Sequence, residues 1–283
     1  MASATIKPSS KIQKFKPQFR SMVATTIASL SGIVGAIPGS LPIAQADIIG
    51  ADNRIVPSYE WMTQTNRQAI GRLEIQKADG LYYACTFTVV GRNIGLTNTH
   101  CLLDEQGRGP QQIKAFALQH GSRVFAAANV DTYWTGLKTF PKTLGDATRD
   151  WAVIRFTSDL GTQTGWFGNE PYSNRVTNAG QSVAGKLTHL IGYSGGGTTP
   201  TGHLNCNILP VISGIVPHNC DSTSGSSGSS LHTSDRRIQG LNWGSFTYRG
   251  VTINGAVPLE RFMPAVQKLR ETGAASNTVV PIP

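Results

Sequence analysis

Residues 220–230 read Cys-Asp-Ser-Thr-Ser-Gly-Ser-Ser-Gly-Ser-Ser, and no other stretch of the chain is as informative. A flexible glycine–serine linker has a similar composition. The stretch is short, however, and it lies between Cys220 and a strand-like run, Ile238–Trp243, so it belongs inside a folded unit. Small residues around Ser227 permit a tight turn whose N–H groups face a substrate carbonyl. Ser227 becomes a nucleophile once a base takes its proton.

A histidine upstream is a candidate for that base. Residues 96–101, Leu-Thr-Asn-Thr-His-Cys, place His100 after the end of an apolar run and directly before Cys101. A general base needs a fixed position, because small displacements cost much of the rate. A bridge from Cys101 to Cys85 would close a loop of fifteen residues and contribute about 3 kcal/mol in the chain-entropy model. By itself, a histidine beside a cysteine is weak evidence, and a packed or surface side chain is the default explanation.

An acidic residue between these two segments is a candidate for orienting the histidine. Asp150 opens the apolar run Trp151–Phe156, where a buried carboxylate would hold His100 and stabilise its protonated form. A turn residue that caps a loop is the alternative role. Asp146 is a rival four residues upstream, but its neighbours Gly145 and Ala147 are more typical of an ordinary turn.

The pattern of apolar residues predicts an all-β protein with one helix. Short runs rich in β-branched and aromatic residues are separated by Gly, Asn and Asp, which indicates a sandwich or barrel. Pro258–Thr272 carries apolar residues at steps of three and four, which predicts a carboxy-terminal helix. Leu160–Asn178 could join two halves. The expected strands are Ala69–Ile75, Tyr82–Val90, Ile94–Thr97, Val124–Val130, Trp151–Phe156, Gln181–Leu187, His189–Tyr193, Asn207–Ile215, Ile238–Trp243 and Val251–Val257.

The amino-terminal residues 1–46 are expected to be an export signal, with or without a short pro-segment. They hold five basic residues and no acidic one, then the weakly apolar run Met22–Leu41, then Ala44-Gln45-Ala46 as a cleavage pattern. An uncleaved anchor is the alternative, although prolines and glycines in the run disfavour a spanning helix. Without these residues the net charge of +9 falls to +4, with no cluster of Lys and Arg, so a nucleic-acid partner is not expected. No later run is long enough to span a membrane.

The four cysteines fit an exported protein. An even count in an oxidising compartment predicts two disulfides, with three pairings open among Cys85, Cys101, Cys206 and Cys220. A zinc site is the alternative, but no Cys-x-x-Cys spacing supports it.

In the order His, Asp, Ser, these segments resemble the chymotrypsin-like serine proteases, and most of all the bacterial branch that includes the glutamyl endopeptidases. The resemblance covers residues 65–272. It rests on the stretches 97–101, 150–153, 192–195, 220–229, 240–244 and 254–257.

The resemblance implies two six-stranded antiparallel β-barrels with the site in the cleft between them, assigned here to residues 47–165 and 166–283, the second carrying the helix. It implies Ser227 as nucleophile, His100 as general base and acid, Asp150 as the orienting carboxylate, and an oxyanion hole from the N–H groups of Gly225 and Ser227. It also implies the bridges Cys85–Cys101 and Cys206–Cys220. The expected substrate pocket is formed by Asp221, Ser222, Asn242, Trp243 and Gly244.

The sequence departs from the pattern at three positions. Ser226 stands where digestive relatives have an Asp that pairs with a newly freed amino terminus, so activation of that kind is not expected. Asn242 stands where glutamyl endopeptidases have a His that helps to bind an acidic side chain. Asp221 falls near the pocket base of trypsin-like relatives, where it would favour Lys or Arg in the substrate. Ser230 replaces a common proline, with an effect expected on loop rigidity rather than on chemistry.

The sequence therefore predicts a secreted or periplasmic serine endopeptidase that acts as a monomer on protein or peptide substrates. No cofactor and no catalytic metal are expected, while the scattered acidic residues leave a structural calcium open. Two alternatives remain: a catalytically silent homologue that serves as an extracellular binding module, and an unrelated β-barrel in which Ser, His and Asp coincide by chance.

Overall fold

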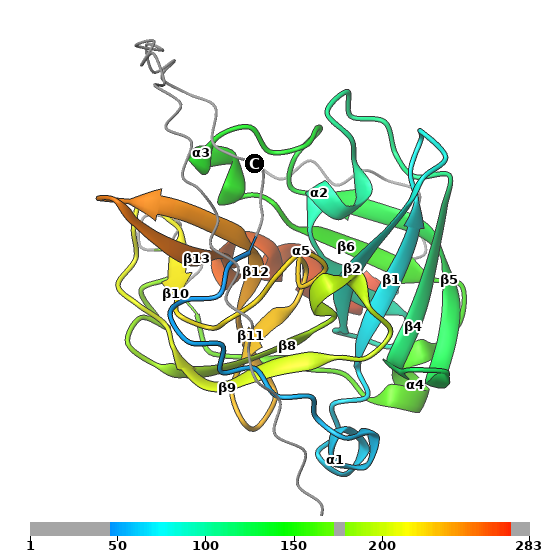
Figure 1. Ribbon diagram of the computed structural model, residues 1–283. Helices are drawn as coiled ribbons and strands as arrows, with labels where there is room; N and C mark the ends of the chain where they lie inside the picture. The colour runs from blue at the N-terminus through cyan, green and yellow to red at the C-terminus, as the bar shows by residue number, and fades with distance from the viewer. Residues whose placement is uncertain (1–45, 173–178, 273–283) are drawn as a thin grey trace, which may run out of the picture. The chain divides into compact units, whose positions relative to one another are not determined.

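Six antiparallel strands near the start of the chain close into a barrel. The computed structural model describes residues 46–172 and 179–272. The barrel follows the order β1-β2-β3-β6-β5-β4, and Figure 1 shows these strands grouped together. Every neighbouring pair is antiparallel, so the first predicted barrel is confirmed. The strands are β1 (Ile70–Gln76), β2 (Tyr82–Val89), β3 (Ile94–Thr97), β4 (Gln112–His120), β5 (Arg123–Thr135) and β6 (Ala152–Phe156).

A second sheet of seven strands follows in the chain. Its order is β10-β13-β12-β11-β8-β9, with the short β7 pairing in parallel with β12. The sheet is curled rather than fully closed, and an isolated antiparallel bridge between Ile208 and His218 links its two edges. The expected six antiparallel strands are present, with β7 in addition. The strands are β7 (Gly168–Asn169), β8 (Leu187–Gly192), β9 (Thr201–Asn207), β10 (Val216–His218), β11 (Ser230–His232), β12 (Arg237–Tyr248) and β13 (Val251–Pro258).

Several strand predictions were wrong in the second half. Residues 181–185 form turns, and residues 208–215 form isolated bridges. The strands β4, β7, β9, β10 and β11 were not predicted. The short ones carry little periodic signal, since β10 and β11 have three residues each and all of them are buried.

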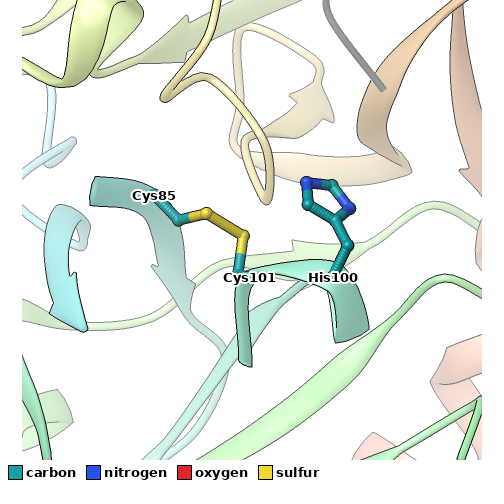
Figure 2. A group of neighbouring side chains, drawn as sticks. All are labelled: Cys85, His100 and Cys101. Carbon is teal, nitrogen blue, oxygen red and sulfur yellow. A yellow bond between two sulfur atoms is a disulfide. The ribbon is translucent and has the colours of Figure 1, made fainter. Parts of the chain in front are cut away.

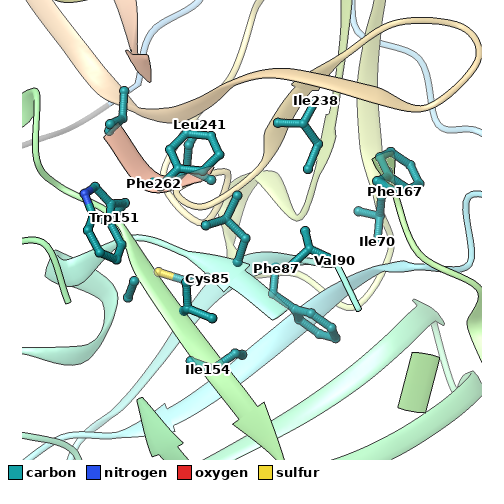
Figure 3. Packing of buried hydrophobic residues seen from close by; sticks show 14 of the residues in the cluster. Ile70, Cys85, Phe87, Val90, Trp151, Ile154, Phe167, Ile238, Leu241 and Phe262 are labelled. Carbon is teal, nitrogen blue, oxygen red and sulfur yellow. The ribbon is translucent and has the colours of Figure 1, made fainter. Parts of the chain in front are cut away.

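Five α-helices and one short 3-10 helix, η2 (Ser194–Gly196), accompany the sheets in the described residues. The carboxy-terminal helix α5 (Leu259–Thr272) agrees with the predicted range and buries Phe262 and Val266 against the sheets. Figure 3 shows Phe262 near Leu241 and Trp151 in the packed interior. The other helices are α1 (Tyr59–Gln64), α2 (Thr99–Leu102), α3 (Leu144–Ala147) and α4 (Leu160–Thr164). None of the described helices has the length and apolar character that a membrane span requires.

The residues before α1 are held by the second sheet. Ile55 forms an antiparallel bridge with Gly202 in β9, and both backbone hydrogen bonds of that bridge are made. Asp47 donates its N–H to Asn254 and accepts a hydrogen bond from the Asn254 side-chain amide. Residues 46–55 are called the N-terminal segment below. The predicted export signal, residues 1–46, lies outside the described residues except for Ala46.

Candidate active site

The α2 helix fixes His100 directly after β3. The Thr99 hydroxyl donates to the carbonyl of Trp151 over 2.8 Å, and the Lys77 ammonium donates to the carbonyl of His100 over 2.9 Å. A disulfide joins Cys101 to Cys85 in β2, and Figure 2 shows this bridge beside the His100 side chain. The helix that carries His100 is therefore tied to three other segments.

Asp150 lies directly against His100. Its Oδ2 is 2.6 Å from His100 Nδ1, and its Oδ1 accepts the backbone N–H of His100 over 3.0 Å. The Asp150 side chain has no exposed surface. The backbone bond fixes the carboxylate against α2 and the bond to Nδ1 holds the ring, which is the arrangement that orients a general base.

The rival Asp146 has a different role. Its carboxylate accepts the N–H groups of Lys142 and Thr143, and it completes a capping box at the start of α3 with the Thr143 hydroxyl. A carboxylate at a helix start is a structural cap. The structure therefore brings Asp150, and not Asp146, to the histidine.

Ser227 stands on a tight turn between two glycines in left-handed conformations. Gly225 has φ +91° and Gly228 has φ +83°. A Cβ at Gly225 would lie 2.3 Å from the carbonyl oxygen of Tyr193, and one at Gly228 would lie 2.2 Å from that of Thr86. Both positions therefore require glycine for conformation and for space.

The backbone N–H groups of this turn fall into two kinds. Those of Ser226, Gly228 and Ser229 donate to carbonyl groups of the protein. Among the hydrogen bonds of the described residues, none uses the N–H of Gly225 or of Ser227. These are the two groups expected to form an oxyanion hole, and two free donors on one turn suit that role.

Thr86 in β2 joins the turn to the first barrel. Its N–H donates to the carbonyl of Ser227, and its hydroxyl donates to the carbonyl of Gly225, each over 2.8 Å. The same hydroxyl accepts the N–H of Tyr193 over 2.9 Å. Sequence reasoning missed Thr86, because nothing in the residues around it marks this contact.

The segment that carries His100 also approaches the Ser227 turn directly. The Sγ of Cys101, next to His100, lies 4.0 Å from the carbonyl oxygen of Ser227. The described residues form no hydrogen bond between the Ser227 hydroxyl and the His100 ring. Hydrogen bonds of this kind often tighten only when substrate binds.

The expected pocket residues are buried. Asp221 differs from the others because its carboxylate bonds to the N-terminal segment. Asp221 Oδ1 accepts the N–H of Ile49 over 2.7 Å, and Oδ2 accepts that of Asn53 over 2.8 Å. His203 Nδ1 lies 3.2 Å from Oδ2. The carboxylate is thus used to hold the N-terminal segment, which argues against the preference for basic substrates suggested by its position in the sequence.

The remaining pocket residues pack behind the turn. Ser222 is fully buried, and its hydroxyl has no hydrogen-bond partner in the described residues. The Trp243 indole N–H is likewise buried and unpaired, and the ring lies against Gly255, where a Cβ would sit 2.9 Å from Nε1. Asn242 is fully buried, and Gly244 is buried beside Trp243.

A metal site is not supported at this place. Cys85, His100 and Cys101 bring their ligand atoms within 4.8 Å of one another. Both sulfur atoms belong to the disulfide, however, so neither is a thiolate that binds metal. The second bridge, Cys206–Cys220, also forms, and the two pairings are those that the resemblance implies.

A surface hollow of about 590 Å³ next to Arg92, Trp166 and Arg270 contains none of the candidate residues.

Comparison with solved structures identifies the fold. A Glu endopeptidase in complex with MPD matches with a TM-score of 0.63 and 20% identity, over 79% of this chain and 99% of that chain. The thermostable serine protease AL20 from an extremophilic microorganism matches with a TM-score of 0.57 and 16% identity, over 75% and 100% of the two chains. The fold is that of the chymotrypsin-like serine proteases. The fold predicted from the resemblance is therefore confirmed.

Other comparisons agree with this fold or give no match. The protease Anisep from Arthrobacter nicotinovorans matches with a TM-score of 0.56 and 15% identity, over 71% of this chain and 96% of that chain. No protein-family model and no curated protein matches the sequence. The chymotrypsin-like fold therefore rests on structure, and the roles of individual residues rest on the geometry described above.

Proposed function

We propose that the protein is a secreted serine endopeptidase that hydrolyses peptide bonds with Ser227, His100 and Asp150. The chymotrypsin-like fold and the protease neighbours support peptide hydrolysis as the reaction. The observation that carries the residue roles is the buried contact between Asp150 and His100, 2.6 Å long, together with a glycine-flanked Ser227 whose carbonyl oxygen lies 4.0 Å from the Sγ of the adjacent Cys101.

The proposed reaction follows from these positions. His100 accepts the proton of the Ser227 hydroxyl while Oγ attacks the carbonyl carbon of the scissile peptide bond. The resulting oxyanion accepts hydrogen bonds from the N–H groups of Gly225 and Ser227. His100 then gives the proton to the leaving amine, and the C–N bond breaks to leave an ester on Ser227.

Water completes the cycle. His100 takes a proton from a water molecule, whose oxygen attacks the ester carbonyl, and returns that proton to Ser227 Oγ as the ester breaks. The Asp150 carboxylate stabilises the imidazolium that forms in each half-reaction. No group outside the protein and water is needed to balance these steps.

Export is proposed on separate grounds. Both disulfides are formed, and all four cysteines are used. Stable disulfides are typical of oxidising compartments outside the cytosol. The basic and then apolar residues 1–46 are the corresponding signal in the sequence.

A fluorophosphonate probe tests the proposal, because it reacts only with an activated serine. We expect the full chain to be labelled and to hydrolyse casein, and Ser227→Ala to lose both activities. Ser224→Ala is the matched control, since Ser224 lies on the same loop but is exposed. Labelling that survives Ser227→Ala would refute the proposed nucleophile, and an intact, folded chain that is never labelled would refute the function.

A further inference from the structure

Asn242 in β12 contacts the Ser227 turn on both sides of the serine. Its side-chain Nδ2 donates to the carbonyl of Ser226 over 3.1 Å. Its backbone carbonyl accepts the N–H of Gly228 over 3.0 Å, and its backbone N–H donates to the carbonyl of Ser229 over 2.9 Å. One buried residue therefore holds Ser226, Gly228 and Ser229, which flank Ser227 on both sides.

The other end of the Asn242 amide is held by His218 in β10. Its Oδ1 lies 3.2 Å from His218 Nε2, and both side chains are fully buried. Because Nδ2 is already used as the donor toward Ser226, Oδ1 faces the ring, and His218 must donate from Nε2. Burial lowers the pKa of His218 to about 4, so the ring is neutral at ordinary pH.

His218 in turn is fixed within the second sheet. It pairs with Asn254 in the register of β10 and β13. The chain of contacts therefore runs from the sheet through His218 and Asn242 to the Ser226 carbonyl. Both ends of the Asn242 amide therefore bond to groups of the protein, and the side chain is fully buried.

We propose that Asn242 and His218 are a pair of positioning residues that hold the Gly225–Gly228 turn, and that Asn242 does not select the substrate side chain. This proposal rests on the proposed peptidase function. The turn carries both the nucleophile and the two free N–H groups, so a shift of the turn moves all three relative to His100. Such a shift affects the transition state more than substrate binding.

The test is a set of four variants: Asn242→Ala, Asn242→Asp, His218→Leu and His218→Gln. The two Asn242 variants and His218→Leu should lower fluorophosphonate labelling and kcat by about 10- to 100-fold, with KM changed by less than about threefold. Asp at position 242 cannot donate to the Ser226 carbonyl, so it should not rescue the rate. Gln at position 218 can still place an N–H where Nε2 of His218 lies, so His218→Gln should keep most of the rate of the unaltered protein.

The discriminating measurement compares three peptides with Arg, Glu and Phe before the scissile bond. A positioning role lowers kcat for all three by the same factor, so their ratios stay within about threefold of those of the unaltered protein. A change of ratio beyond about tenfold would overturn the proposal, because it would mean that Asn242 reads the side chain. Unchanged labelling in Asn242→Ala would overturn it as well.

Two controls separate positioning from loss of stability. Ile238→Val removes a buried methyl group from the same strand, and Thr247→Ala alters an exposed position of β12. Neither should change the labelling rate.

Amide hydrogen exchange of residues 224–231 gives a readout that does not need activity, and it should accelerate in Asn242→Ala. Faster exchange in a chain that is never labelled would refute the peptidase function while supporting the role of Asn242. Unchanged exchange would refute the role itself.

Discussion

Replacing Asp221 by Asn tests what this buried carboxylate does. One oxygen accepts the N–H of Ile49 and the other accepts that of Asn53, at 2.7 and 2.8 Å. An Asn side chain keeps one acceptor, but its NH₂ group then faces one of the two N–H groups. Losing a hydrogen bond to a buried charged group and leaving a donor unpaired costs about 3 kcal/mol.

The loss should be concentrated in the N-terminal segment. Asp47 keeps its hydrogen bonds to Asn254, so the segment should open from Ile49 to Asn53 before the barrels unfold. A local cost of about 3 kcal/mol raises the population of the open state by about 150-fold. Amide hydrogen exchange at Ile49 and Asn53 should accelerate by that factor.

The same variant decides between two roles of Asp221. If it holds the segment, exchange accelerates and the ratio of cleavage after Arg and after Phe is unchanged. If it forms the base of the substrate pocket, cleavage after Arg falls selectively and exchange at Ile49 is unchanged, which would refute this interpretation. Asp52→Asn is the control: its pair with Arg54 is solvent-exposed, and water screens such a pair, so exchange at Ile49 and Asn53 should stay close to that of the unaltered protein.

Three further predictions concern the site and its support. Asp150→Asn should lower kcat for casein hydrolysis by about 10³- to 10⁴-fold, because the amide stabilises the wrong tautomer of the histidine; activity near that of the unaltered protein would contradict the role. Replacing Cys85 and Cys101 together by Ser removes a bridge between residues 16 apart, and urea unfolding should show a loss of about 3 kcal/mol. Burial lowers the pKa of His218 to about 4 and that of His232 to about 3. Both histidines are protonated more readily in the unfolded chain. Their contribution to the free energy of unfolding is therefore fully present above about pH 6.5, and it falls toward pH 4 by up to about 1.4 kcal/mol per pH unit for each histidine. A free energy of unfolding that is equal at about pH 7 and pH 5 would contradict this.

The first barrel was easier to predict than the second sheet for a physical reason. Tyr82–Val89 and Ala152–Phe156 are long enough for β-branched and aromatic residues to mark them. Val216–His218 and Ser230–His232 have three residues each, and partners far away in the chain decide that they are strands. Gln112–His120 alternates buried and less buried positions, but its apolar positions include Ala115 and Ala117, which give a weak signal.

The candidate site was predictable where local residues carry the signal. The glycines around Ser227 and the cysteine beside His100 are local, and the structure brings these segments together with Asp150. Thr86 was missed, because its hydrogen bonds reach across 139 residues to Gly225. The true partners of Asp221 were also missed, since Asn53 lies 168 residues away and no local pattern links them.

The Ser227 turn is held by uncharged groups, and this bears on how the site becomes ordered. Ser226 stands where digestive relatives have an Asp that pairs with a new amino terminus. Its hydroxyl lies 2.7 Å from the hydroxyl of Ser194 instead. The N-terminal segment is instead bonded at Asp221, through backbone N–H groups that exist whether or not the chain is cut upstream. Thr86, Ser194 and Asn242, which hold the turn, all come from the two sheets and the loop next to β8. Because their contacts form when the sheets pack together, the order of the turn should depend on folding and not on the release of a new amino terminus.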